Sequence, residues 1–332
     1  MATEPDAVPT TPSRRRLHGH WWTVWPTLRD RVRPPRAPVA TRVQFAADDE
    51  RFGPIALSAE LRSRPEQRDL VLLVHGLGGS CQSGYVQRAA AEFDRLGFAS
   101  LAINLRGADR SGAGVYNVAL HDDLAAACRS DAAAPFERIF VLGFSMGGHT
   151  AIHFAAANVD ARVAGASAVC TPLDLHEAQR HIDHPRRAAY RHYVLGGLKE
   201  IYAAAAVRQP LPSPVSAVSR CRTIHDWDRL VIAPLYGFAD PESFYAASSA
   251  RAVLPNLRVP VRLVLAASDP VIPHHLALPW IRAAAPGMLA VHAPERGGHL
   301  YFPSDLDLGQ PGERGLAAQL AAAWRGARDR RS

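Results

Sequence analysis

The stretch FVLGFSMGGH, residues 140–149, places one serine among glycines directly after an apolar run. The apolar run predicts a buried strand, and the residues after the serine predict a helix. Gly143, Ser145 and Gly147 satisfy the pattern G-x-S-x-G, which marks a nucleophile elbow when it joins a strand to a helix. Glycines are needed there because the serine is held in a strained turn, where a Cβ on either side would collide with neighbouring backbone. The stretch therefore predicts a nucleophilic serine at the end of a strand.

Strands and helices alternate on both sides of this turn. After two early strands at 41–47 and 53–61, further strands are predicted at 69–75, 98–105, 138–144, 162–169, 259–269 and 288–294. Helical segments lie between or after them, at 83–97, 122–130, 146–158, 274–285 and 312–329. This alternation predicts the α/β class, with a mostly parallel central sheet and helices on both faces.

The pattern is interrupted between residues 172 and 250, where amphipathic helical segments are broken by prolines. We expect a helical cap or lid over the carboxyl edge of the sheet, inserted between two core segments at 39–171 and 251–332. Its tyrosines, Tyr190, Tyr193 and Tyr202, either line an apolar acyl pocket or are structural. Residues 1–38 form an N-terminal tail, disordered to about residue 16, and then a segment rich in Trp and Arg.

A serine hydroxyl is a weak nucleophile until a base removes its proton, so an acid and a histidine should follow Ser145 in the chain. Asp269 ends a predicted strand, and His299 follows two glycines in the loop after the last strand. The loops at the carboxyl edge of a parallel sheet converge, so these side chains can meet. We therefore predict Ser145 as nucleophile, Asp269 as acid and His299 as base. Asp174 is the reserve acid, and Asp269 could instead be a cap before Pro270.

The loop HGLGGS at residues 75–80 follows a fully apolar strand. Acyl transfer needs two backbone N–H donors for the oxyanion. One donor usually comes from the residue after the nucleophile, and the other comes from a loop placed as this one is. We assign them to Met146 and Leu77, with His75, Gly76 and Gly78 as substrate contacts. The alternative for the loop is an ordinary glycine turn.

Several longer motifs are distinctive beyond the elbow: HWWTVWPTL, HGLGGSCQSGYVQRAAAEFDRLGFASLAINLRG, GFSMGGH, TPLDL, YGFADPESFYAASSA, LVLAASDPVIP and GGHLYF. Over roughly residues 18–305 the chain resembles the YheT-like α/β-hydrolases, a carboxylesterase branch that also contains mammalian membrane-associated lipid hydrolases. The resemblance implies an α/β-hydrolase fold and cleavage of esters rather than amides. It also implies the same nucleophile, acid and base: Ser145, Asp269 and His299.

Two places depart from that family's pattern. Ala108 and Asp109 stand where relatives carry a more glycine-rich run after Arg-Gly, which changes the shape expected for that loop. Leu300 and Tyr301 replace a usual Val-Gly after the histidine, which changes what faces the pocket.

The resulting prediction is a serine hydrolase that cleaves short- to medium-chain acyl esters through an acyl-enzyme. The first alternative is a membrane-associated monoacylglycerol lipase or phospholipase, in peripheral contact with the membrane through Trp21, Trp22 and Trp25. These tryptophans could equally pack onto the main domain. The second alternative is a non-catalytic binding protein of the same fold, against which the intact Ser, Asp and His argue.

Other classes of function are not indicated. The net charge is +7, but the arginines are scattered, so no nucleic-acid partner is predicted. His149 and His153 lack an H-E-x-x-H pattern, and no G-x-G-x-x-G follows a first strand, so neither metal nor cofactor is expected. Asp122 and Asp123 are expected to begin a helix. Without a signal peptide or an apolar run near 18 residues, a cytoplasmic protein is predicted, and the sequence leaves the oligomeric state open.

Overall fold

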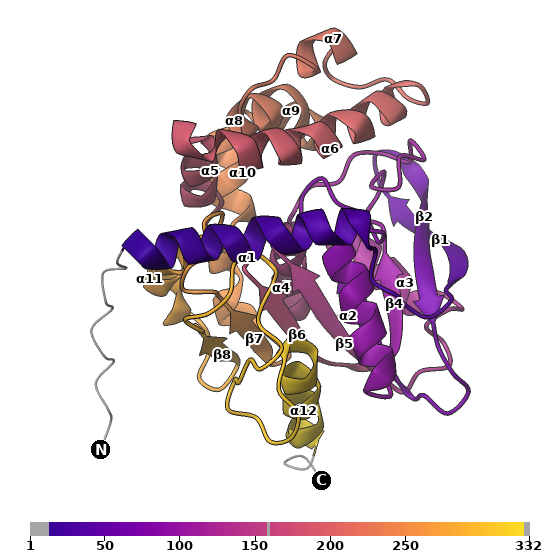
Figure 1. Cartoon of the computed structure of the whole chain (residues 1–332). Coiled ribbons are helices and arrows are strands. Elements are labelled where there is room, and N and C mark those ends of the chain that lie inside the picture. The colour runs from indigo at the N-terminus through magenta and orange to yellow at the C-terminus, as the bar shows by residue number, and fades with distance from the viewer. Residues whose placement is uncertain (1–12, 158–159, 329–332) are drawn as a thin grey trace.

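The computed structural model describes residues 13–157 and 160–328, and its centre is an eight-stranded sheet with the order β1-β2-β4-β3-β5-β6-β7-β8 (Figure 1). β1 pairs with β2 and β2 with β4 in antiparallel fashion, and the pairs from β4 onward are parallel. The predicted mostly parallel α/β fold is therefore confirmed. The strands are β1 (Thr41–Asp49), β2 (Gly53–Arg62), β3 (Asp69–Val74), β4 (Ala99–Ile103), β5 (Arg138–Phe144), β6 (Val163–Val169), β7 (Val261–Val264) and β8 (Leu289–His292).

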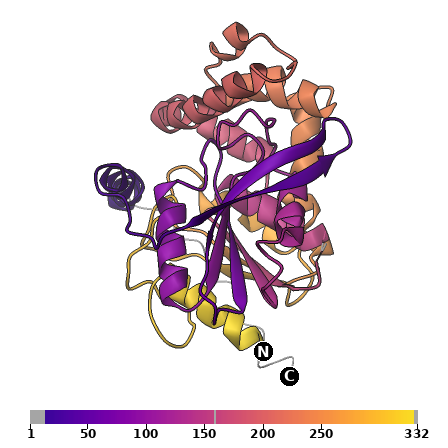
Figure 2. The same cartoon turned by 90° about the vertical axis from the view of Figure 1, so that its right-hand side faces the viewer.

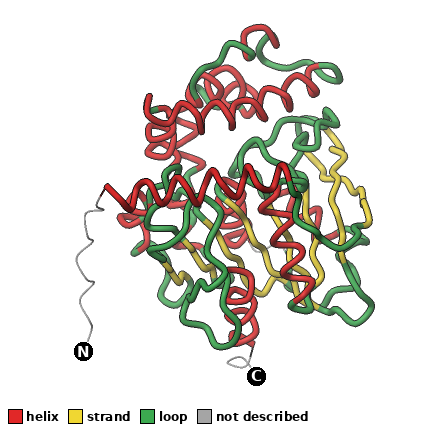
Figure 3. The backbone as a smooth tube through the Cα atoms, in the orientation of Figure 1, coloured by secondary structure: helices red, strands yellow, loops and turns green. Residues whose placement is uncertain are grey.

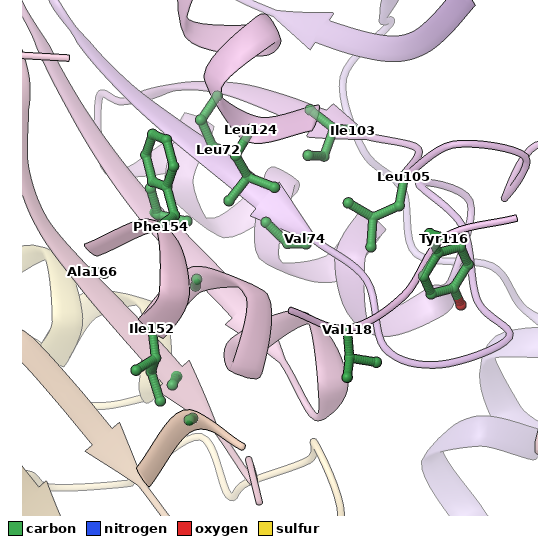
Figure 4. Packing of buried hydrophobic residues seen from close by; sticks show 14 of the residues in the cluster. Leu72, Val74, Ile103, Leu105, Tyr116, Val118, Leu124, Ile152, Phe154 and Ala166 are labelled. Carbon is green, nitrogen blue, oxygen red and sulfur yellow. The ribbon is translucent and has the colours of Figure 1, made fainter. Parts of the chain in front are cut away.

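Helices cover both faces of this sheet, and the central strand shows why. Alternate side chains of a strand point to opposite faces, and in β3 both sets are completely buried. Leu70, Leu72 and Val74 join the cluster beneath α3 (Asp122–Arg129) and α4 (Met146–Ala157), part of which Figure 4 shows. Val71 and Leu73 join the cluster beneath α2 (Gly84–Arg95) and α12 (Leu316–Arg328). A strand buried on both faces reads as a continuous apolar run, which is why this strand was easy to predict.

Between β6 and β7 the chain leaves the sheet and forms a helical cap (Figures 1 and 3). The cap lies at the carboxyl ends of the parallel strands, where it shares a cavity with Ser145. Its α-helices are α5 (Leu175–Asp183), α6 (Ala188–Ala206), α7 (Val215–Val218), α8 (Ile224–Trp227), α9 (Ala233–Tyr236) and α10 (Pro241–Ser248), with a π-helical turn, η2 (Asp228–Ile232), between α8 and α9.

The N-terminal segment differs from the prediction. Helix α1 spans Ser13–Val32, so the disorder expected to about residue 16 is wrong from residue 13 onward, and residues 1–12 lie outside the described part of the chain. In Figure 1 α1 runs across the front of the molecule, at a height between the cap and the sheet, and in Figure 2 it is seen nearly end-on at one side. Trp21 and Trp25 are exposed rather than packed onto the main domain, whereas Trp22 is half-buried.

A second difference concerns the helix predicted over residues 274–285. The chain there forms a 3-10 turn, His274–Leu276, and a short helix, α11 (Leu278–Ile281). Pro279 supplies no backbone N–H and disfavours helical geometry in the residue before it. Pro279 therefore interrupts helical hydrogen bonding at the start of α11, and the single long helix predicted here is wrong. Among the described residues, no helix is both long and apolar enough to cross a membrane.

Candidate active site

Ser145 sits in a tight turn between β5 and α4. Its φ is 53°, in the left-handed region that residues with a Cβ rarely adopt. A Cβ at Gly143 would lie 2.2 Å from the carbonyl oxygen of Gly147, and a Cβ at Gly147 would lie 2.3 Å from that of His75. Both glycines are therefore required by close backbone approach, as the sequence pattern indicated.

The structure brings together the three side chains predicted for the triad. His299 Nε2 lies 3.1 Å from Ser145 Oγ, and His299 Nδ1 lies 2.9 Å from Asp269 Oδ2. The other carboxylate oxygen, Oδ1 of Asp269, accepts the backbone N–H groups of Val271 at 2.7 Å and Ile272 at 3.0 Å. Asp269 is thus both the cap and the partner of the histidine. Because an ionised carboxylate can only accept, Nδ1 donates and Nε2 is left to accept from the serine hydroxyl.

The oxyanion loop is held in place by two tyrosines. The N–H of Gly76 donates to the hydroxyl of Tyr85 at 2.9 Å, and the N–H of Gly78 donates to that of Tyr116 at 2.7 Å. Burial raises the pKa of Tyr85 to about 12, so this hydroxyl stays protonated near neutrality. In the described chain, no group accepts a hydrogen bond from the intervening N–H of Leu77 or from that of Met146. Both residues line the cavity at Ser145, and their amides are available to a ligand.

Two of the predicted substrate contacts support the loop instead of facing the cavity. Gly76 lines the cavity, whereas His75 and Gly78 are not part of its lining. His75 Nδ1 lies 2.8 Å from the carbonyl oxygen of Gly76, and its Nε2 accepts the N–H of Leu105 at 3.3 Å. Burial lowers the pKa of His75 to about 4, so the ring is neutral and serves as a backbone brace. The structure thus gives His75 and Gly78 roles in supporting the loop, and their direct contact with substrate stays a prediction.

The triad opens into a cavity of about 770 Å³ between α1, α2 and the cap. Its walls are mainly apolar and aromatic, as is usual for small-molecule sites. Tyr190 and Tyr193 of the cap line it, and the Tyr190 hydroxyl lies 2.6 Å from His20 Nδ1, which joins the cap to α1. Tyr202 does not: its hydroxyl donates to the carbonyl oxygen of Ser213 at 2.6 Å, so Tyr202 is structural.

Helix α1 braces the loop that carries His299, through a contact that could not be predicted from the sequence. The Thr23 hydroxyl accepts the backbone N–H of His299 at 2.8 Å and donates to the carbonyl oxygen of Gly19, also at 2.8 Å. Further along α1, the Tyr301 hydroxyl donates to Asp30 at 3.1 Å. Thr23 is buried. Positions 276 residues apart along the chain share no sequence pattern that could reveal this bond.

Replacing Thr23 with valine is expected to lower kcat for a soluble ester by about 10-fold, since the His299 N–H would lose its only partner at a cost of about 1–3 kcal/mol. Thr23→Ser keeps the hydroxyl and is expected to retain activity within about 3-fold, by the same reasoning. Steady-state kinetics across pH, with kcat and KM reported separately, would test this. A loss in Thr23→Ser as large as that in Thr23→Val would show that a general disturbance of packing at this position, and not loss of the hydrogen bond, lowers kcat.

Of the three other acids of the sequence analysis, two have structural partners. Asp174 caps α5 by accepting the N–H groups of His176 and Glu177 and pairs with Arg251 at 2.9 Å, and it has no contact with His299. Asp123 is buried against Arg106, whose backbone N–H and guanidinium donate to it at 2.8 and 2.7 Å, whereas Asp122 is exposed at the start of α3. The reserve acid is thus not positioned to replace Asp269.

The first departure from the family pattern, at Ala108 and Asp109, lies in a loop that is held by hydrogen bonds to Asp109. Ala108 is completely buried, and Asp109 accepts the hydroxyl of Ser58 at 2.5 Å and the N–H of Ser111 at 3.0 Å. Leu300 and Tyr301, the second departure, both line the cavity. Leu300 and Tyr301 therefore form part of the cavity wall, whereas Ala108 and Asp109 do not line the cavity.

Residues that could ligate a metal are already engaged. His149 and His153 lie against the backbone carbonyls of Pro172 and Ser248. In the described part of the chain, the group of side chains close enough to share an ion is Cys170, Asp269 and His299. Two of these are bonded to each other, and burial raises the pKa of Cys170, which keeps it a thiol. The group is thus better suited to proton transfer than to metal binding.

Comparisons with known proteins identify the family and the fold. A family model described as serine aminopeptidase, S33, matches residues 65–301. The chain is similar to an abhydrolase domain-containing protein of Dictyostelium discoideum, with 25% identity over 82% of this chain and 72% of that protein. It is also similar to the putative esterase YheT of Escherichia coli strain K12, with 24% identity over 74% of this chain and 73% of that protein. The Pyrococcus furiosus esterase Pf2001 has a similar fold, with a TM-score of 0.50 and 15% identity over 90% of each chain.

Proposed function

The chain belongs to the serine aminopeptidase S33 family of α/β-hydrolases, and from this premise we propose that it is a serine esterase that cleaves carboxylic esters through an acyl-enzyme. The predicted likeness to the YheT-like branch is confirmed by the Escherichia coli relative, which is named a putative esterase. One observation carries the proposal: His299 lies within 3.1 Å of Ser145 Oγ and 2.9 Å of Asp269.

In the proposed reaction, Ser145 Oγ attacks the ester carbonyl carbon while His299 Nε2 takes the hydroxyl proton. The oxyanion accepts hydrogen bonds from the free N–H groups of Leu77 and Met146. Collapse of the tetrahedral intermediate breaks the bond to the alcohol, which leaves with the proton from His299. Water then attacks the acyl-enzyme with His299 as base, and the acid departs. Throughout, Asp269 holds the imidazole in the tautomer that can accept.

The mainly apolar cavity supports acyl esters of short to medium chain as substrates. The test measures labelling by a fluorophosphonate probe and turnover of p-nitrophenyl esters of graded acyl length, beside the matching p-nitroanilides. We expect labelling and faster turnover of esters than of anilides. Faster turnover of the anilides would favour a peptidase, and absence of both labelling and turnover would favour a binding protein.

A second candidate, a lipase that works at a membrane surface, is favoured by the orientation of α1. A surface helix normally buries its apolar face, but α1 does the reverse. Trp22 is half-buried, but five large apolar residues form one outward stripe at helical spacing: Trp21, Val24, Trp25, Leu28 and Val32. The residues turned inward are small or polar: Gly19, Thr23, Pro26 and Asp30. Contiguous exposed apolar surface of this kind marks an interaction site.

The chemistry of this stripe fits a lipid surface with anionic headgroups. Trp21 and Trp25 are 58% and 50% exposed, and tryptophan is favoured where apolar and polar phases meet. Exposed Arg29, Arg33 and Arg36 follow on the same segment and would attract anionic headgroups. Val24 and Leu28 belong both to the stripe and to the cavity wall. A lipid ester could therefore pass from the surface along α1 to Ser145.

Replacing Trp21 and Trp25 together with serine is expected to weaken binding to vesicles of phosphatidylcholine and phosphatidylglycerol by at least about 10-fold, since burying each side chain contributes about 1.5–3 kcal/mol. Turnover of a soluble ester should be unchanged, because neither residue lines the cavity. Vesicle co-sedimentation measures the binding, with Val207→Ser, which removes an exposed apolar side chain of the cap, as the control. Unchanged binding would exclude the lipid surface. A wild-type dimer that the double variant dissociates without vesicles would assign the stripe to self-association.

A further inference from the structure

The cap side of the cavity contains an acid that the proposed reaction does not use. Asp228 begins the π-helical turn η2 and lines the cavity beside apolar side chains, among them Trp227, Ile232 and Phe244. Its side chain is buried, with 6% of the residue exposed. Single π-helical turns inside helices often occur at functional sites.

The carboxyl group of Asp228 has a partner for one oxygen only. The Tyr245 hydroxyl donates to Oδ2 at 2.7 Å, and no donor in the described chain contacts Oδ1. No described lysine or arginine lines this cavity, so the acid has no cationic partner there. The neighbouring acid, Asp183, is occupied by the N–H groups of Ile224 and His225. Oδ1 of Asp228 has no protein partner in the described chain and belongs to a residue that lines the cavity, so a ligand in the cavity can hydrogen-bond to it.

We propose that Asp228 and Tyr245 form a polar subsite that binds a hydroxyl group of the substrate. The proposal rests on the serine esterase function and adds a substrate class to it: esters that carry a hydroxyl on either the acyl or the alcohol part. The two parts present the same chemistry to the subsite, so substrates of both kinds are needed to tell them apart.

A hydroxyl fits this subsite better than an ammonium group does. Burial and the nearby Asp183 raise the pKa of Asp228 to about 7, so both protonation states are populated near neutrality. A hydroxyl can donate to the ionised carboxylate and accept from the neutral acid. An ammonium group can only donate and requires the ionised form. The adjoining Tyr245 oxygen can accept a further hydrogen bond from the same ligand.

The test compares matched pairs of esters with and without the hydroxyl. The acyl pair is a p-nitrophenyl hydroxyalkanoate and the unsubstituted alkanoate, and the alcohol pair is a glyceryl monoester and the propyl ester of the same acid. We expect wild-type kcat/KM to favour the hydroxylated ester by about 10-fold or more in one pair, since one buried hydrogen bond to a charged group reaches that size. Asp228→Leu should reduce the ratio to about 1, because leucine cannot hydrogen-bond.

Two further variants separate the subsite from a general effect on the cap. Asp228→Asn keeps a polar group of the same shape and should retain the hydroxyl preference. Asp226→Asn alters an acid outside the cavity lining and should leave the ratio unchanged. If Asp228→Leu does not fold, Asp228→Ala provides the same comparison.

The outcomes distinguish this proposal from the esterase proposal beneath it. If the wild type hydrolyses p-nitrophenyl esters but shows a ratio near 1 in both pairs, the subsite is excluded and the esterase stands. A preference for the hydroxylated ester that persists in Asp228→Leu would also exclude the subsite. If an amino substituent raises kcat/KM more than a hydroxyl does, the subsite would be assigned to cationic groups. If no ester is turned over, the esterase proposal itself fails.

Discussion

Replacing Ser145 with alanine is expected to lower kcat for ester hydrolysis by up to about 10⁶-fold, the loss seen when a serine hydrolase loses its nucleophile. The methyl group cannot form the acyl-enzyme, and His299 would have no hydroxyl proton to remove. The free N–H groups at Leu77 and Met146 would remain, so substrate binding should persist. Single-turnover and steady-state hydrolysis of a p-nitrophenyl ester measure the loss, and a fluorophosphonate probe measures whether any nucleophile remains.

The matched control for this experiment is Ser167→Ala. Ser167 lies in β6, is completely buried, and its Oγ has no hydrogen-bond partner. Removing that hydroxyl leaves nothing unsatisfied, so labelling and turnover should match the wild type. Probe labelling that persists in Ser145→Ala, and is absent after Ser167→Ala, would assign the nucleophile elsewhere and overturn the proposed role of Ser145.

The parts of this site that could be predicted are those with a local physical cause. The glycines around Ser145 follow from a strained turn, and β3 is recognisable because a strand buried on both faces is apolar throughout. Asp269 and His299 could be identified because parallel strands bring their carboxyl-end loops to one edge. In each case the cause can be read from a short stretch of sequence or from the order of strands and loops along the chain.

The parts that could not be predicted depend on contacts between distant segments. Tyr85 and Tyr116 brace the oxyanion loop through their hydroxyls, and Thr23 braces the histidine loop. A lone tyrosine or threonine has no spacing that distinguishes such a partner from any core or helical residue. Asp228 was missed for the same reason, since its significance comes from its burial in a cavity and not from its neighbours in sequence.

Helix α1 shows a different kind of failure. The usual rule places the apolar side of a helix toward the core, and here it would place Trp21 and Trp25 against the sheet. The structure instead turns Gly19 and Thr23 inward, where a Cβ at Gly19 would lie 1.8 Å from the carbonyl oxygen of Ser268. Close backbone approach therefore decides which face is buried. The sequence left open whether these tryptophans pack onto the main domain or face outward, because the direction depends on this contact.

Replacing Asp269 with asparagine is expected to lower kcat by about 10⁴-fold, the effect of presenting a triad histidine in the wrong tautomer. The N–H groups of Val271 and Ile272 require an acceptor at the position of Oδ1. The asparagine carbonyl would take that position, and its NH₂ group would face His299 Nδ1. Nδ1 must then accept, so the proton moves to Nε2 and the ring can no longer take the proton of Ser145. Kinetics with a soluble ester measure the loss.

Asp174→Asn is the matched control for Asp269→Asn. Asparagine is as good a helix cap as aspartate, so the variant loses mainly the ion pair with Arg251, a partly exposed contact of about 0–1 kcal/mol. Thermal unfolding should shift slightly, and kcat should stay within about 3-fold of the wild type by this estimate. If Asp174→Asn were instead the variant that loses activity, the reserve acid would be the partner of His299. The 2.9 Å contact between Asp269 and His299 would then belong to a state other than the reactive one.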